Sequence, residues 1–178
     1  MKNEKSYKGE LMDIGTKNEV IVFNWLQMQK CKVIDFRQFK LLQGPDVDCS
    51  IVSIDGQVTF AEIKADQHIG DSGNLCFECF RINHFVVENM FYLGWGWRSA
   101  AQKLIVRNPN TGITYIFDFR NLRQFIGKYV DKMGKSFKNN ILVTETDKQK
   151  TTFNFLIPMK ELEKEKEKLY IGCIITGD

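Results

Sequence analysis

The sequence has no long hydrophobic run. No apolar stretch approaches the roughly 18 to 20 residues that a helix needs to cross a bilayer. The first residues, MKNEKSYKGE, are polar and include acids, which is unlike a signal or transit peptide. We therefore expect a cytoplasmic protein with no membrane partner.

Cysteine is scarce, and its pattern does not suggest pairing. The chain has 5 Cys, an odd number, and no export signal, so a disulfide framework is not expected. Cys76 and Cys79 form a C-x-x-C without a second pair, and in a strand this spacing places the two thiols on opposite faces. We interpret the cysteines as free core thiols, with zinc or redox chemistry as the alternative.

A large excess of one charge is also missing. Lys and Arg number 25 against 22 Asp and Glu, a net charge of +3, so there is no basic arm of the kind that binds nucleic acid on its own. Any phosphate-binding face must come from local clustering of cations. One basic series is either such a face or an ordinary solvated surface: Arg120, Arg123, Lys132, Lys135 and Lys138.

What is present is an ordinary globular composition. A chain of 178 residues that is 43% hydrophobic and 26% charged has room for one domain with a sizeable core. No internal repeat or linker is visible. We predict a single domain over residues 1–178.

Periodicity predicts helices and strands mixed around one central sheet, an α/β or α+β chain. We expect residues 1–15 to be a polar lead-in and Thr16 to open a helix, because Thr16-Lys17-Asn18-Glu19 matches the capping-box pattern S/T-x-x-E. Residues 84–93 fit a helix or a strand. Further strands are expected at 32–38, 47–53, 57–64, 74–81, 103–107, 114–119, 141–144, 152–157 and 169–175, and further helices at 121–129 and after Pro158.

The chain is organised around a hairpin between Gly44 and Asp66. Ile54-Asp55-Gly56 is a turn signal with Gly where a left-handed residue is needed. With a three-residue loop, Ser53 faces Gln57. Counting back then places Asp48 opposite Glu62 and Asp46 opposite Lys64, whereas a two-residue loop would shift the register and remove this match.

Carboxylates and an ammonium on one patch of a sheet are poor core material, because buried charges must be paired or coordinate metal. Asp48, Glu62 and the Ile63 carbonyl offer the oxygen ligands that Mg²⁺ or Mn²⁺ prefer. Lys64 lies on the same face as Glu62 and can position a water or a scissile phosphate. Glu19 either caps its helix or reaches over the sheet toward the metal. This set predicts metal-dependent phosphodiester hydrolysis.

Pro45-Asp46 and Asp48, followed by Glu62-Ile63-Lys64 with Glu19 on a preceding helix, resemble the PD-(D/E)XK nuclease superfamily. The resemblance covers about residues 16–120, with 121–178 as C-terminal strand and helix additions. It implies a restriction-endonuclease-like fold, in which a helix precedes a central sheet that carries the active-site hairpin. Asp48 or Asp46 and Glu62 would bind the metal, Lys64 would be catalytic, and Glu19 would match the helix acid of some members.

Two further segments are similar to small phage-type members of the superfamily: GNLCFE at 73–78 and GWGWRSAAQ at 94–102. Ala101-Gln102 departs from the Ala-Asp pair expected there, which puts any role for Gln102 in doubt. The resemblance implies a Mg²⁺-dependent endodeoxyribonuclease that acts on DNA. A homodimer is plausible, because a double-strand cut needs two active sites. The alternative is an inactive module of the same fold that binds nucleic acid or a protein.

The remaining polar and aromatic residues near the motif have weaker interpretations. Glu78 is expected to be an edge-strand carboxylate facing water, with metal or substrate binding as the alternative. His68, in a loop rich in Asp, Gly and Ser, is expected to be exposed. Trp95 and Trp97 fit core or lid packing better than stacking on an unpaired base.

Overall fold

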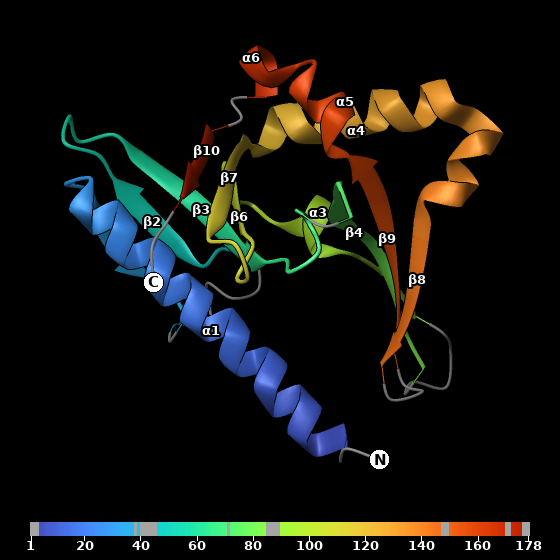
Figure 1. The fold of residues 1–178 in the computed structure, drawn as a ribbon, viewed down its shortest axis with the longest axis horizontal. Helices are drawn as coiled ribbons and strands as arrows, with labels where there is room; N and C mark the ends of the chain where they lie inside the picture. The colour runs from blue at the N-terminus through green and yellow to red at the C-terminus, as the bar shows by residue number, and fades with distance from the viewer. Residues whose placement is uncertain are drawn as a thin grey trace.

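The structure is a computed structural model that describes residues 4–37, 39, 46–70, 72–84, 90–146, 150–169 and 172–175. Its strands form two sheets, as the ribbon in Figure 1 shows. The six-stranded sheet has the order β1 (Lys32–Asp35), β2 (Cys49–Val52), β3 (Val58–Ala65), β6 (Lys103–Arg107), β7 (Ile113–Asp118) and β10 (Gly172–Ile175). The four-stranded sheet has the order β5 (Met90–Leu93), β4 (Asn74–Asn83), β9 (Lys150–Pro158) and β8 (Ile141–Thr146).

The helices are α1 (Glu4–Met28), α3 (Trp95–Arg98), α4 (Phe119–Met133), α5 (Met159–Glu163) and α6 (Lys166–Leu169), with a 3₁₀ helix η1 (Gly134–Asn140) after α4. Strands and helices mix along the chain, which confirms the predicted mixed α+β class. Within the described residues, no helix is long and apolar enough to cross a membrane.

The predicted start of the first helix is wrong. α1 begins at Glu4, so Thr16 lies inside the helix and Glu19 is not part of an N-terminal capping box. The segment assigned as a lead-in is rich in Glu, Lys, Leu and Met and has no proline, and these residues favour a helix over a coil. A match to S/T-x-x-E within a longer stretch of helix formers does not mark a boundary.

α1 covers one face of the six-stranded sheet (Figure 1). Its Val22, Phe23 and Leu26 are buried against side chains from three strands, Cys49, Ala61, Ile63 and Ile105. These helix residues lie at helical spacing on one stripe, as the sequence pattern predicted. Ile63 therefore points toward α1, and its strand neighbours Glu62 and Lys64 point to the other face.

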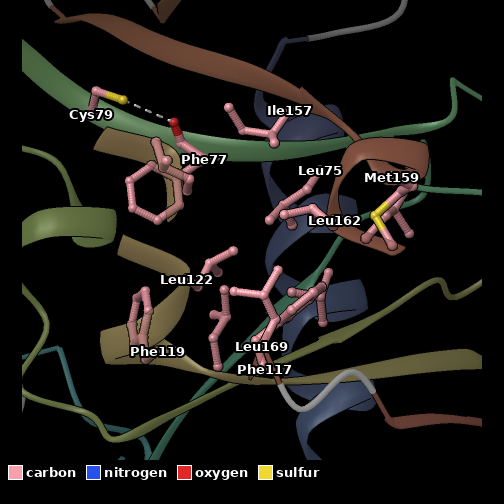
Figure 2. Packing of buried hydrophobic residues seen from close by; sticks show 14 of the residues in the cluster. Leu75, Phe77, Cys79, Phe117, Phe119, Leu122, Ile157, Met159, Leu162 and Leu169 are labelled. Carbon is pink, nitrogen blue, oxygen red and sulfur yellow. Dashed lines mark hydrogen bonds between the residues drawn. The ribbon is translucent and has the colours of Figure 1, made fainter. Parts of the chain in front are cut away.

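The larger core lies on that other face, between the six-stranded sheet, α4 and the four-stranded sheet. Phe117 of β7, Phe119 and Leu122 of α4, and Phe77 of β4 meet there (Figure 2). Asp118 caps the N-terminus of α4, and its side chain accepts a hydrogen bond of 3.0 Å from the Asn121 amide. This core joins both sheets into one packed structure.

The expectation that all strands join one sheet is wrong. β3 pairs with β2 in antiparallel and with β6 in parallel orientation, so both of its edges are taken. A parallel neighbour needs a long connection, and here that connection, residues 66–102, contains β4, β5 and α3. β4 pairs with β9, far along the chain, and builds the second sheet. Periodicity predicts that a segment is a strand but does not identify its partner.

Candidate active site at the β2–β3 hairpin

The hairpin has the predicted register. The Ser53 amide donates to the Gln57 carbonyl at 3.0 Å around a three-residue loop, and Gly56 has φ +82°. Cys49 pairs with Ala61, and the Asp48 amide donates to the Ala61 carbonyl at 3.0 Å. The register is thus confirmed over Cys49–Val52, and Asp48 lies one residue before the paired stretch, next to the β3 residues 61–63.

Asp48 comes immediately before β2, and its side chain bonds to β3. Its Oδ2 accepts a hydrogen bond of 2.6 Å from the Ile63 amide. This contact holds the carboxylate against β3 beside Glu62. Burial raises the pKa of Asp48, and the Lys64 ammonium and the Ile63 amide offset this only in part.

Glu62 is a buried acid with one oxygen unpaired. Its side chain is 1% exposed, and Oε1 forms an ion pair with Lys64 Nζ. Oε2 is buried and has no hydrogen-bond partner among the described residues. Burial raises the pKa of Glu62 to about 8, against the lowering effect of Lys64, and Asp48 raises it further. Such an arrangement costs stability, and it is typical of functional positions.

Lys64 is held as a cation beside these acids. Its side chain is 34% exposed and lies 5.5 Å from the centre of the Trp95 ring. Burial opposes its charge, but Glu62 and Asp48 outweigh this effect, and the pKa of Lys64 is raised. Lys64 therefore stays protonated at neutral pH and acts as a fixed positive charge.

Glu19 approaches the same place from α1. Its Oε2 accepts a hydrogen bond of 3.1 Å from Arg37, which also pairs with Asp35. Burial and then the Asp48 charge raise the pKa of Glu19, while Arg37 and Lys64 lower it. Glu19 and Lys64 also line one hollow of the surface together. Sequence reasoning missed Arg37, although Asp35-x-Arg37 alternates onto one face of the predicted strand.

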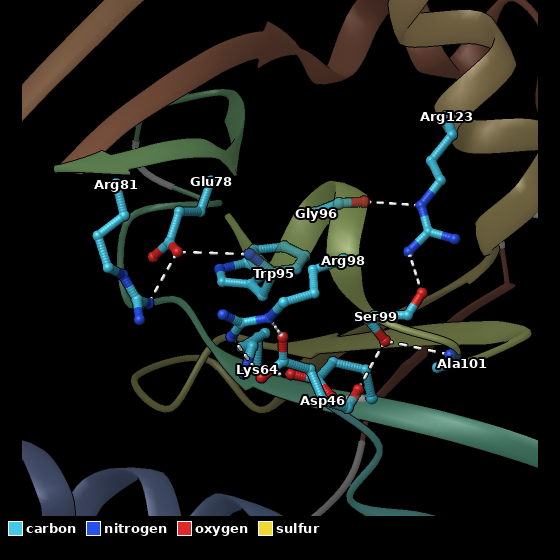
Figure 3. A network of polar contacts seen from close by, with 11 residues as sticks. Asp46, Lys64, Glu78, Arg81, Trp95, Gly96, Arg98, Ser99, Ala101 and Arg123 are labelled. Atoms are coloured by element: carbon cyan, nitrogen blue, oxygen red, sulfur yellow. Dashed lines mark hydrogen bonds and ion pairs between the residues drawn. The ribbon is translucent and has the colours of Figure 1, made fainter. Parts of the chain in front are cut away.

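The counted register predicts that Asp46 lies opposite Lys64, and this prediction is wrong. Asp46 pairs with Arg98 instead. It has φ +50°, and both of its carboxylate oxygens accept hydrogen bonds from Arg98, at 2.5 and 2.8 Å. Its carbonyl accepts a bond of 2.6 Å from the Ser99 hydroxyl (Figure 3). A positive φ turns the chain away from the line of the strand, so the register cannot be extended past Asp48. Pro45 lies outside the described residues.

Glu78 lies on an inner strand and is largely buried, not on an edge strand facing water. β4 is an inner strand between β5 and β9, and the Glu78 side chain is 12% exposed. It accepts a bond of 2.8 Å from Arg81 and a long one of 3.4 Å from the Trp95 amide (Figure 3). The prediction of a water-facing edge carboxylate is therefore wrong. Glu78 links the second sheet to α3.

The Gly94-Trp95-Gly96-Trp97 segment places α3 tightly on β4. A Cβ on Gly94 would lie 2.5 Å from the Glu78 carbonyl oxygen, so only glycine fits there. Trp95 and Trp97 pack on the Phe77 ring, with ring centres 5.5 and 5.2 Å apart. This confirms the packing interpretation of the two tryptophans.

Two other residues weighed from the sequence have structural contacts. The Gln102 side chain accepts a bond of 3.0 Å from the Phe60 amide, and its backbone bonds to Phe60 and Phe119. Arg123 donates bonds of 2.6 Å to the carbonyls of Gly96 and Ser99 (Figure 3). Gln102 thus extends the start of β6, and Arg123 holds α3 against α4.

Two hollows meet at Lys64. One, of about 240 Å³, runs from Lys64 to Trp95 and the second sheet, and is lined there by Cys76, Asn154 and Leu156. The other, of about 420 Å³, lies between Lys64 and α1, where Ile14, Gly15 and Glu19 line it. Residues 64–66 and the exposed His68 border both. We refer to the two hollows together as the cleft: α1 lines one of them, the four-stranded sheet lines the other, and the end of β3 lies between them.

The donor set fits a hard divalent cation. No group of three His, Cys, Asp or Glu in the described ranges is arranged to hold a metal by itself. A cation here would instead take oxygens from Asp48, from Glu62 and from the Ile63 carbonyl, with water completing the shell. The buried, unpartnered Oε2 of Glu62 supports this fit.

Comparisons with known proteins give one structural likeness. No family model matches the chain, and no curated protein sequence matches it. A solved structure, the bacterial homing endonuclease I-Ssp6803I, is similar to it with a TM-score of 0.45 and 10% identity, over 59% of this chain and 66% of that one. The function is therefore argued from the site itself.

Proposed function

We propose that this chain is a metal-dependent endodeoxyribonuclease of the PD-(D/E)XK type. The observation that supports the proposal is the cluster at the hairpin: Asp48 bonds to the Ile63 amide, Glu62 pairs with Lys64, and Glu62 Oε2 is buried without a partner among the described residues. Helix α1 precedes the sheet that carries the hairpin, as in the fold that the resemblance implies.

The proposed roles follow from the charges of the site. Asp48 and Glu62, with the Ile63 carbonyl, hold Mg²⁺ or Mn²⁺, and Glu19 adds negative charge from α1. Lys64 orients the scissile phosphate and the attacking water as a point charge. When bound, the metal supplies charge neutralisation on the phosphodiester and lowers the pKa of a water. The Trp95 ring packs against the Lys64 ammonium in a cation–π contact. The substrate would enter along the cleft.

The test is cleavage of supercoiled plasmid with and without Mg²⁺. Glu62→Ala and Lys64→Ala should each reduce cleavage by about a hundredfold or more. The ion pair between Glu161 of α5 and Lys164, the residue after α5, offers matched controls, because Glu161→Ala and Lys164→Ala remove the same kinds of side chain far from the hairpin in sequence. Undiminished cleavage by both hairpin variants would refute the assignment.

A second candidate is an inactive module of this fold that binds nucleic acid or a protein. It is favoured by the direct ion pair between Glu62 and Lys64, which satisfies both charges without any metal. Calorimetry with Mn²⁺ separates the two. The nuclease binds Mn²⁺ through Asp48 and Glu62, whereas the inactive module need not bind it at all.

A further inference from the structure

One face of the four-stranded sheet is polar and continues the catalytic cleft. In the β4–β9 pairing, Glu78 is opposite Asn154, Arg81 is opposite Thr152, and Asn83 is opposite Lys150. Opposed residues share a face of a sheet, and Thr152 and Lys150 share one along β9. Glu78 and Arg81 also bond to each other, so all of these side chains lie on the same face.

A bulge in β4 is what keeps Arg81 on this face. The pairing shifts by one residue between Glu78 and Phe80, so that Cys79 is an extra residue in the strand. In a regular strand, residues three apart point to opposite faces, and Arg81 would then lie on the face opposite Glu78. The bulge therefore reorients Arg81 toward the cleft side.

This face begins at the catalytic lysine. Cys76, Asn154 and Leu156, which belong to it, line the same hollow as Lys64. From there the face runs along β4 and β9 past Glu78 and Arg81 to Lys150. The opposite face carries exposed Phe80 and Leu93, an apolar pair unsuited to phosphate.

Two cations and one acid lie on the polar face: Arg81, which is paired with Glu78, and Lys150. Lys150 is half-buried, and among the described residues no acid forms an ion pair with it. Burial lowers the pKa of Lys150, and the nearby cations Arg81 and Arg98 lower it further, against the opposing effect of Glu78. Arg81 keeps a buried Nε with no partner in the described part of the chain. An anion placed here would relieve the crowding of cations.

We propose that the polar face of β4 and β9 binds the phosphate backbone of DNA as the strand leaves the cleft, with Arg81 and Lys150 as the contacting cations. The proposal rests on the proposed nuclease function for the identity of the ligand. It assigns the second sheet, which the hairpin does not need for its chemistry, a role in holding the substrate. Phosphate contacts of this kind fix the position of a duplex without reading its sequence.

The test measures binding separately from cleavage. A fluorescein-labelled DNA duplex is titrated with the full chain in EDTA, and anisotropy is followed over a series of salt concentrations. Lys150→Gln and Arg81→Gln should each raise Kd by about fivefold to tenfold near 0.1 M salt and reduce the salt slope by about one. Lys164→Gln, which removes a 66% exposed Lys just after α5, should leave both values within about twofold.

Arg81 has a structural partner in Glu78, so Lys150→Gln is the deciding variant and thermal melting checks that it folds. An unchanged Kd and salt slope for Lys150→Gln overturns the inference, even if the wild type cleaves plasmid. The absence of any DNA binding by the wild type in EDTA also overturns it. Weakened binding in both variants supports it, even if the wild type proves unable to cleave.

Discussion

At the scale of single residues, Glu62 is where stability and function oppose each other. Its side chain is 1% exposed and keeps Oε2 without a partner in the described residues. Glu62→Gln removes a buried acid whose ionisation burial makes costly, and it retains a hydrogen-bond acceptor for Lys64. We expect this variant to be as stable as the wild type without metal, or more stable by about 1 kcal/mol, and to lose cleavage.

Thermal unfolding in EDTA, together with the plasmid assay, measures both effects. Glu161→Gln, at an exposed ion pair, is the control and should change neither. A Glu62→Gln protein that is destabilised by several kcal/mol would show that Glu62 is a structural residue. That result would contradict the functional interpretation of its unpaired oxygen.

The two acids before β2 have different roles in this account. The Asp48 carboxylate accepts a hydrogen bond from the Ile63 amide, next to Glu62, whereas both oxygens of Asp46 accept hydrogen bonds from Arg98. Asp48→Asn should weaken Mn²⁺ binding by about tenfold or more. Asp46→Asn should leave Mn²⁺ binding within a few fold and cost about 1 kcal/mol of stability, because its Arg98 partner is partly exposed.

Calorimetric titration of both variants with Mn²⁺ makes this comparison. The sequence left the choice between the two acids open, and counting the turn favoured Asp48 only if the loop had three residues. A larger loss of Mn²⁺ affinity in Asp46→Asn than in Asp48→Asn would reverse the assignment.

At the scale of elements, the contact between α3 and β4 depends on glycine. A Cβ on Gly94 would lie 2.5 Å from the Glu78 carbonyl oxygen, and backbone cannot move aside cheaply. Gly94→Ala should therefore destabilise the protein by about 2 kcal/mol or more. Gly127→Ala in α4 meets no atom within 4 Å and should stabilise it by about 0.5 to 1 kcal/mol.

Denaturant unfolding of the two alanine variants measures this contrast. Because both variants replace glycine with alanine, a difference between their changes in unfolding free energy measures the difference in packing around the two positions. Equal stability of the two variants would mean that α3 is not packed against Glu78 as described.

Strand β4 carries two free thiols, the buried Cys79 and the partly buried Cys76. Burial raises the pKa of Cys79 to about 12, and it does the same for Cys76. Both thiols therefore stay protonated at pH 8 and should react slowly with a disulfide reagent in the folded protein, and fully after unfolding. Peptide mapping after labelling tests this, and rapid labelling of Cys79 in the native state would contradict the packing of β4.

Local patterns explain which elements the sequence predicts well. The Ile54-Asp55-Gly56 turn predicts the hairpin register well. Glycine adopts the positive φ of +82° that the three-residue loop needs, and the loop length then sets which residues pair. The capping motif at Thr16 does not predict the start of α1, because it lies within a longer run of helix-forming residues that begins at Glu4. The bulge at Cys79 leaves no local signal, since it depends on pairing with β9.

At the scale of the whole molecule, the chemistry of the site was more predictable than its surroundings. Glu62, Lys64 and Asp48 come from one hairpin, so strand alternation brings them together. Arg98 and Arg81 reach the site region through α3 and the second sheet, and nothing local in the sequence indicates that β4 pairs with β9. The predicted single domain over residues 1–178, with a core at 16–120, stays a prediction, as does the homodimer.

The central claim is that the hairpin is a working metal-dependent nuclease site. Its most direct measurement is the rate of plasmid cleavage in Mg²⁺ by Lys64→Ala beside Lys164→Ala. The two changes remove the same side chain, but only Lys64 lies against Glu62 and the cleft. We expect the cleavage rate to fall by about a hundredfold or more in Lys64→Ala and to stay unchanged in Lys164→Ala. Equal, metal-independent rates in the wild type and both variants would contradict it.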